Sequence, residues 1–213
     1  MPVKSKSRKP YSSPARTAAA DETRVRIIDA ARTLLAGERD APAFSLDAVA
    51  RKAGVTRLTV YNQFEAKRGL LEAVFDDTAR RGGLFELSSV LAEPDVAKAL
   101  RRFVSVFCGF WSAHGKVFPK FSAVARLDDE IAESLRQRSE RRRHALTVLM
   151  GRLGPAQDHA DLVDALFALT SFEMFEMLSV RGRTPAAAEA LIQQLASDLL
   201  GHYSGKRAKR KAQ

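Results

Sequence analysis

The stretch that most constrains this chain runs from Phe44 to Leu71 and reads FSLDAVARKAGVTRLTVYNQFEAKRGLL. Ser45 can cap a short helix, because its hydroxyl can accept a hydrogen bond from a free amide of the first turn. Apolar residues then recur at spacings of three and four as far as Ala53, which places them on one helical face. Gly54 follows, and glycine adopts the left-handed conformation of a helix C-cap without steric cost. The pattern predicts a helix over residues 46–53 that ends in a tight turn.

A second short helix is predicted directly after this turn, over residues 57–63, with Thr56 as its cap. It is too short to be stable alone, so neighbouring elements must hold one of its faces. Two helices joined by a glycine-containing turn within about 20 residues are typical of a DNA-reading motif. The same geometry also occurs without DNA, so a plain solvated helix in an all-α domain is the alternative interpretation.

The outward face of the second helix is expected to be polar, with Val55, Val60 and Phe64 turned inward. Guanidinium, hydroxyl and amide groups bond phosphates and base edges in the major groove of DNA. The candidates for base contact are Arg57, Thr59 and Asn62. The candidates for phosphate contact are Ser45, Thr56, Tyr61 and Lys67.

This stretch resembles the N-terminal domain of the tetracycline-repressor-like (TetR) family of bacterial transcription regulators. The resemblance rests on FSLDAVARKAGVT, on the aromatic pair Tyr61 and Phe64, and on Lys67 with the two leucines that follow. It implies a helical DNA-binding domain, a larger helical domain that binds a small-molecule effector, and a homodimer. The sequence departs from the family pattern at three positions: Leu58 replaces a small residue, Gln63 an aromatic or His, and Glu65 a Pro. The first two bear on which bases are read.

The net charge of +10 comes from the two ends of the chain. Residues 1–20 and 205–213 each carry five basic residues and no acidic one, so the remainder is neutral. Such arms favour polyanions in a salt-dependent and sequence-independent way, although they can also serve only to keep the protein soluble. We expect residues 1–20 to be a disordered basic arm and residues 205–213 a disordered basic tail.

Several classes of protein are not supported by the sequence. The single cysteine, Cys108, excludes an intramolecular disulfide and is interpreted as a small buried hydrophobe. The four histidines lack the spacing of a metal site, and no phosphate loop or nucleophile elbow is present. No apolar run approaches the ~20 residues that cross a bilayer. We therefore predict a cytoplasmic protein without catalytic residues, metal or cofactor.

All regular elements are predicted to be helices, which gives an all-α fold of two domains. The first, residues 21–81, holds a helix over residues 21–36, the helix-turn-helix and a fourth helix that ends at Gly82. The second, residues 84–204, is interpreted as the effector-binding and dimerisation domain. Its last two helices are predicted over residues 157–181 and 185–203.

These last two helices carry the candidate dimer interface. Each has an apolar stripe, and two neighbouring stripes can serve both the subunit core and a partner subunit. The stripes are Leu162, Leu166 and Leu169 on one helix and Leu191, Leu195 and Leu199 on the other. Periodicity alone also allows both stripes to complete only the core of one subunit.

Aromatic residues of the second domain are candidates for an effector pocket, because such pockets are mostly apolar with a few polar groups. They are Phe103, Phe107, Phe110, Trp111, Phe118, Phe121, Phe172 and Phe175. Glu173 and Glu176 interrupt the apolar run FEMFEM, and a buried carboxylate requires a partner. The partner is expected to be an arginine of the protein, with a cationic effector as the alternative. Plain core packing is the simpler interpretation of the aromatic residues.

The sequence predicts a homodimeric regulator, a repressor released from a palindromic operator by a small molecule. Its partners would be double-stranded DNA, a second copy of itself and the effector. Two alternatives remain from the sequence alone. One is a sequence-tolerant, nucleoid-type DNA binder driven by the basic tails. The other is a helical ligand-binding or enzymatic domain with a vestigial helix-turn-helix.

Overall fold

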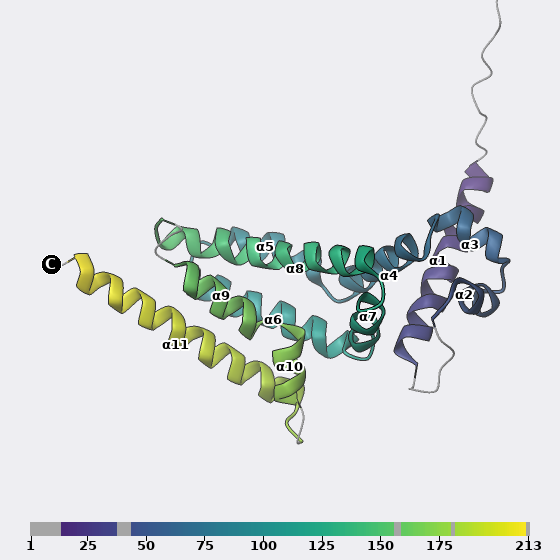
Figure 1. The fold of residues 1–213 in the computed structure, drawn as a ribbon. Helices are drawn as coiled ribbons and strands as arrows, with labels where there is room; N and C mark the ends of the chain where they lie inside the picture. The colour runs from purple at the N-terminus through teal and green to yellow at the C-terminus, as the bar shows by residue number, and fades with distance from the viewer. Residues whose placement is uncertain (1–13, 38–43, 156–158, 180–181, 212–213) are drawn as a thin grey trace, which may run out of the picture.

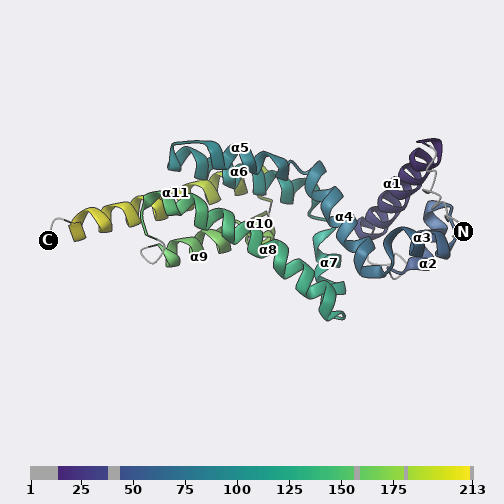
Figure 2. The same ribbon diagram turned by 90° about the horizontal axis from the view of Figure 1, so that it is seen from above.

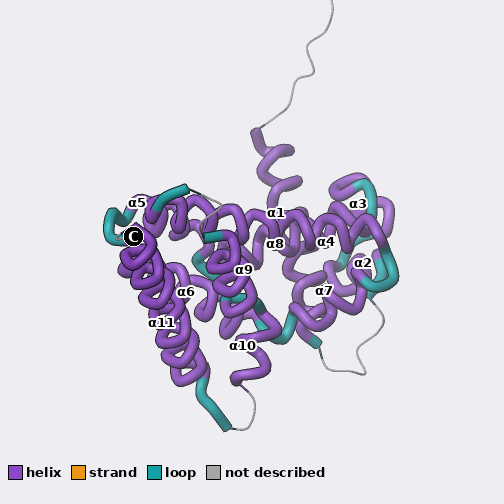
Figure 3. The backbone as a smooth tube through the Cα atoms, turned by 60° about the vertical axis from the view of Figure 1, so that its left-hand side comes forward, coloured by secondary structure: helices purple, strands orange, loops and turns teal. Residues whose placement is uncertain are grey.

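The computed structural model describes residues 14–37, 44–155, 159–179 and 182–211, and within these ranges all regular elements are helices (Figure 3). The predicted all-α class is therefore confirmed. The helix-turn-helix lies at one end of an elongated molecule, and the last helix reaches towards the opposite end (Figures 1 and 2).

Four helices form the end that carries the helix-turn-helix: α1 (Pro14–Ala36), α2 (Leu46–Ala53), α3 (Arg57–Phe64) and α4 (Lys67–Arg81). They enclose a core that includes the fully buried Ile27, Val49, Val60 and Leu70. We refer to these four helices as the head. Val25 of α1 lies outside this core, and half of its surface is exposed.

Helix α1 begins before its predicted start at Asp21, so the prediction of a disordered arm is wrong for residues 14–20. Pro14 is compatible with the first turn of a helix, and Ala18, Ala19 and Ala20 all favour helical backbone. The rest of the predicted arm, residues 1–13, lies outside the described residues.

The body follows in two groups of helices. The first group comprises η1 (Leu84–Glu86), α5 (Leu87–Ala92), α6 (Val96–His114), α7 (Phe118–Ala125), α8 (Asp129–Met150) and η2 (Gly151–Leu153). The second comprises α9 (Ala160–Leu169), α10 (Phe172–Ser179) and α11 (Pro185–Lys211). Helix α11 packs along α6, and α9 packs against both α8 and α11. Figure 1 shows this arrangement.

One helix was predicted over residues 157–181, but the chain breaks at Thr170 into α9 and α10. The Thr170 hydroxyl donates to the carbonyl of Leu166 at 2.8 Å, and its own carbonyl accepts from the Trp111 indole at 3.0 Å. The Ser171 hydroxyl then caps α10 by accepting from the amide of Met174 at 3.1 Å. The break thus depends on a contact with α6, which lies far away in the sequence.

The tail was also expected to be disordered, and this prediction is wrong for residues 205–211, which continue α11 as far as Lys211. Lysine, arginine and alanine dominate this stretch, and all three residue types favour helical backbone. The end of this helix lies at the opposite end of the molecule from α3 (Figure 1).

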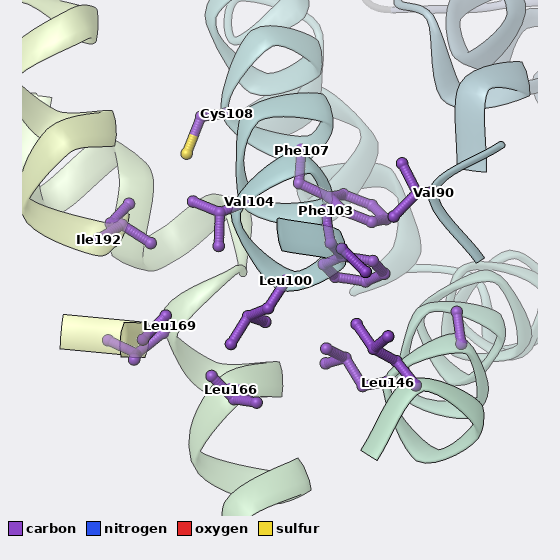
Figure 4. Close-up of a cluster of buried hydrophobic side chains, with 14 of the residues drawn as sticks. Val90, Leu100, Phe103, Val104, Phe107, Cys108, Leu146, Leu166, Leu169 and Ile192 are labelled. Atoms are coloured by element: carbon purple, nitrogen blue, oxygen red, sulfur yellow. The ribbon is translucent and has the colours of Figure 1, made fainter. Parts of the chain in front are cut away.

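The core of the body forms around α6 (Figure 4). Phe103 and Val104 are fully buried there between α11 on one side and α8 on the other. Leu166 of α9 and Ile192 of α11 are also fully buried in this core. No helix within the described ranges is both long enough and apolar enough to span a membrane.

Candidate nucleic-acid interface and interior cavity

The structure confirms the predicted caps of the helix-turn-helix. The Ser45 hydroxyl accepts from the amide of Ala48 at 3.2 Å, and the Thr56 hydroxyl accepts from the amide of Thr59 at 3.1 Å. Gly54 has φ 67° and ψ 36°, the left-handed conformation that ends α2. These local interactions fix where α2 ends and where α3 begins.

The exposed face of α3 carries three of the seven residues predicted for DNA contact. Arg57, Tyr61 and Asn62 are exposed, while Val60 and Phe64 are buried in the head. Leu58 also lies on this outward face, with 65% of its surface exposed. A leucine this exposed on an otherwise polar face is available for contact with another molecule.

Thr59 differs from its neighbours on α3. It is half-buried, and its hydroxyl lies 2.8 Å from the hydroxyl of Thr56. The predicted base contact of Thr59 stays a prediction, and its hydroxyl is shared with the residue that caps the helix. Lys67, at the start of α4, is half-buried, and its ammonium lies 5.8 Å from the centre of the Phe44 ring.

Arg57 makes one ion pair, in which a guanidinium nitrogen lies 3.3 Å from a carboxylate oxygen of Asp47 on α2. Both side chains are at least half exposed. Exposed pairs of this kind contribute about 0–1 kcal/mol. The pair therefore orients Arg57 over the exposed surface. Replacing Asp47 by another anion as the partner of Arg57 would cost little free energy.

Two residues that the sequence interpretation did not single out position α3. Arg24 of α1 donates to the carbonyl of Gln63 at 2.8 Å, and its guanidinium lies 4.4 Å from the centre of the Phe64 ring. Gly69 of α4 lies so close to α3 that an added Cβ would stand 2.3 Å from the Phe64 carbonyl oxygen. The chain reverses between the two helices through Glu65, which has a φ of 61°.

The body contains a cavity of about 810 Å³ between α4, α6, α7, α8 and α10. Six of the predicted aromatic residues line it or lie at its wall. They are Phe107, Phe110, Trp111, Phe118, Phe121 and Phe172. Phe75 of α4 also lines the cavity, and its ring contacts those of Phe110, Phe118 and Phe121 at centroid distances of 5.9–6.5 Å.

Other predicted pocket residues do not line the cavity. Phe103 is fully buried in the core of the body, where Figure 4 shows it beside Phe107, and Phe175 is also buried in that core. The two carboxylates of α10 are exposed, so the premise that they are buried is wrong. Glu173 lies at the cavity wall and Glu176 does not, and within the described ranges neither forms an ion pair with an arginine.

Arginines of α8 contribute most of the charge at the cavity. Arg138 pairs with Asp76 at 2.9 Å, and Arg136 pairs with Glu133 at 2.7 Å. Arg142 is different, because only 8% of its surface is exposed and it forms no ion pair within the described chain. Burial lowers the pKa of Arg142 from 12.5 to about 10, so it is still charged at neutral pH. The sequence indicates only a strongly charged stretch over residues 136–143, which does not reveal this burial.

The two leucine stripes predicted for the dimer interface differ in their burial. Leu162, Leu166 and Leu169 of α9 are buried in the subunit core, so they are not available to a partner. The reason is that α9 lies between α8 and α11, which cover its apolar face. On α11, Leu191 and Leu199 are half-buried and Leu195 is 39% exposed.

Within the described ranges, no group of acidic, histidine and cysteine residues could hold a metal ion.

Comparison with known proteins finds a family model that matches most of the head. The model of the tetR family of bacterial regulatory proteins matches residues 27–74. The head is similar to TtgW, an uncharacterized HTH-type transcriptional regulator of Pseudomonas putida, with 52% identity over 57 residues. It is equally similar to SrpR, an HTH-type transcriptional regulator of the same species. These matches cover 27% of this chain, 42% of TtgW and 26% of SrpR, so the chain spans less than half the length of the curated relatives it matches.

Solved structures resemble the chain over most of its length. A transcriptional regulator from Rhodococcus sp. Rha1 has a TM-score of 0.67 and 19% identity, covering 84% of this chain and 96% of that one. A tetR-family transcriptional regulator from Streptomyces coelicolor has a TM-score of 0.58 and 23% identity, covering 90% of this chain and 86% of that one. At these identities the likeness establishes the fold. Residues 27–74 therefore match the model of the tetR family of bacterial regulatory proteins, and the whole chain shares the fold of the solved transcriptional regulators.

Proposed function

We propose that this protein is a homodimeric transcriptional repressor of the cytoplasm, which binds a palindromic operator and is released by a small-molecule effector. The observation that carries the proposal is the exposed face of α3, which is held from behind by α1 and α4 and offers groups that bond DNA. We assign DNA binding to residues 21–81 and effector binding with dimerisation to residues 84–204.

The contacts with DNA divide between base reading and positioning. Arg57 and Asn62 would read base edges in the major groove, since guanidinium and amide groups bond guanine and adenine there. Leu58 adds an apolar contact suited to a thymine methyl group. Ser45, Thr56, Tyr61 and Lys67 would hold phosphates at the rim of the groove. Thr59 is assigned to the cap of α3.

Dimerisation follows from the small size of the reading element. One helix of eight residues gives little affinity, whereas a two-fold dimer reads two half-sites one helical turn, or a multiple, apart. We assign the partner surface to the outward face of α11 around Leu195, because α9 has no apolar stripe left to offer.

The sequence-tolerant alternative receives less support from this geometry. The helix that carries the C-terminal basic residues ends far from α3, so the two cannot contact the same short stretch of DNA from one subunit (Figure 1). Specific reading through α3 therefore explains more of the structure than does binding through the basic C-terminal end.

The first experiment is a selection of random duplex DNA by the purified protein at near-physiological salt, followed by sequencing of the retained pool. Enrichment of a palindrome supports the proposal. Retention without a motif, falling steeply as salt rises, would favour the sequence-tolerant binder. Loss of all retention at every salt concentration would contradict both.

Arg57→Ala then tests the assigned reading helix. If Arg57 contacts guanine, the substitution costs about 1–3 kcal/mol per half-site and relaxes the selected motif at one position. Arg101→Ala is the matched control, because Arg101 is an exposed arginine of α6 in the body. An equal loss of affinity in both variants would mean that net charge, and not base reading, governs binding. A loss for Arg57→Ala that is uniform across sequences would mark a phosphate contact.

A further inference from the structure

We propose that the cavity of the body binds an apolar carboxylic acid, whose carboxylate is held by the guanidinium of Arg142. The inference rests on the proposed effector function and deepens it by naming the chemical class of the ligand. It replaces the cationic effector that the sequence suggested, because the carboxylates behind that suggestion are exposed.

Arg142 has the geometry of a prepared anion site. Its guanidinium lies 4.2 Å from the centre of the Phe167 ring and 5.7 Å from that of Phe107, and these rings restrict its orientation. One of its terminal nitrogens donates to the Thr170 hydroxyl at 3.3 Å. A guanidinium has five N–H donors, so this single hydrogen bond leaves most of them for a ligand.

The missing counterion is the second observation. A buried charge is costly unless it is paired, and the described chain supplies no carboxylate within ion-pair distance of Arg142. The other arginines at the cavity differ in this respect. Arg138 has Asp76 and Arg136 has Glu133, while Arg126 and Arg141 are exposed to water. A ligand anion would therefore gain most at Arg142.

A carboxylate on an apolar body matches both this cation and the cavity around it. Its two oxygens pair with two parallel N–H groups of a guanidinium, a geometry that adds specificity as well as energy. The rest of the cavity wall is aromatic, with Phe75, Phe110, Trp111 and Phe118 among its residues. About 810 Å³ of such space suits a drug-sized apolar body. A small hydrated anion would leave these aromatic walls unfilled.

The carboxylate of Glu173 provides a second test of the charge of the ligand. It lies at the cavity wall and its charge acts on Arg142 favourably. The carboxylate of Glu173 therefore offsets part of the charge of Arg142 from a distance. A bound carboxylate would be repelled by Glu173, whereas a bound ammonium would be attracted to it.

The experiment compares ligands that share an apolar body and differ in charge. The probes are decanoate, decanamide and decylammonium, with 2-naphthoate and 2-naphthamide as an aromatic pair. Binding to the full chain is measured by calorimetry and, for the decyl series, by fluorescence of Trp111, the only tryptophan in the sequence. We expect the carboxylates to bind at least tenfold more tightly than the amides.

Variants then locate the cation responsible. Arg142→Met should remove the advantage of the carboxylate over the amide, and Glu173→Gln should strengthen carboxylate binding severalfold. Arg141→Met is the matched control, because it removes one positive charge from the same cavity wall without touching the buried site. Arg142→Lys keeps the charge and loses the planar fork, so it should retain only part of the advantage. Binding of decanamide checks that each variant keeps a folded cavity.

Three outcomes would overturn the inference: equal affinity for carboxylate and amide, tighter binding of decylammonium, or no binding of either carboxylate. Equal losses in Arg141→Met and Arg142→Met would overturn the role of Arg142. Retention of operator DNA is measured on the same protein samples. If DNA binding persists while the carboxylates fail, only this inference is wrong. If DNA binding is absent, the proposed function itself fails.

Discussion

The close approach of α4 to α3 leads to a sharp prediction about Gly69. A Cβ at this position would lie 2.3 Å from the Phe64 carbonyl oxygen, and real Cβ atoms essentially never come closer than 3.0 Å. The two helices would have to separate by about 0.7 Å, since a backbone oxygen cannot rotate away. Gly69→Ala should therefore lower the free energy of unfolding and weaken operator binding.

Two opposing effects set the size of this change. Replacing glycine by alanine inside a helix stabilises it by about 1 kcal/mol. Forcing an extra methyl group into a tightly packed contact costs about 1–3 kcal/mol, and the upper part of that range applies where the neighbour is backbone. We expect a net loss of about 1–2 kcal/mol, measured by urea denaturation at fixed protein concentration.

Gly109→Ala is the control, because Gly109 lies inside α6 and an added Cβ would meet no atom within 4 Å. That variant should gain about 1 kcal/mol from helix propensity alone. The affinity of each variant for the selected operator is measured beside its stability. If Gly69→Ala were as stable as Gly109→Ala and bound DNA normally, the argument from steric contact would be refuted.

Three further predictions follow from the burial or exposure of single side chains. Leu166→Ala should lower the free energy of unfolding of the subunit by about 2–5 kcal/mol. Leu195→Glu should leave that free energy nearly unchanged and shift the sedimentation of the protein towards the monomer. A stable dimer of Leu195→Glu would show that the dimer interface does not include Leu195. Burial raises the pKa of the Cys108 thiol from 9.0 to about 12. The unfolded chain therefore loses this proton at a lower pH than the folded protein does. The stabilisation by the buried neutral thiol is full below pH 9 and is lost as the pH rises from 9 to 12. Thermal melts across that range should show the decline relative to Cys108→Ala, and rapid reaction of Cys108 with a thiol reagent in the folded protein at pH 8 would contradict it.

The head could be predicted from the sequence because its signals are local. Ser45 and Thr56 cap helices whose amides lie three residues away, and Gly54 ends a helix through its own backbone. Residues that act within one helical turn leave a pattern that can be read without knowing the fold. The exposure of Arg57 and Asn62 was predicted in the same way, from their place on a helix that is buried on its other face.

Two of the errors have a different origin, which is contact between distant parts of the chain. Thr170 breaks the predicted long helix through hydrogen bonds that involve Trp111 and Arg142. No local pattern indicates such partners. Leu166 and Leu195 carried the same apolar signal, and only the placement of α8 and α11 separates core from surface.

The burial of Arg142 was not predicted, although the sequence contains a local pattern that indicates it. It lies three and four residues before the buried Ala145 and Leu146 and seven before Leu149, so it continues the buried face of α8. The surrounding run of charged residues concealed that periodicity. A charged residue in register with a buried stripe should be treated as a candidate ligand group.

Phe75 of α4 packs in the cores of both head and body, and it also lines the cavity. Val117, Phe121 and Ile131 likewise reach from the body into the core of the head. Because these side chains serve two purposes, selection for a new ligand shape cannot alter them freely. Cavity positions away from this shared cluster are constrained less, because Leu87 packs against the core of the body and not that of the head, and Ser139 is exposed. Diversification of ligand preference, in nature or by engineering, is therefore expected to proceed first through α5 and the exposed side of α8.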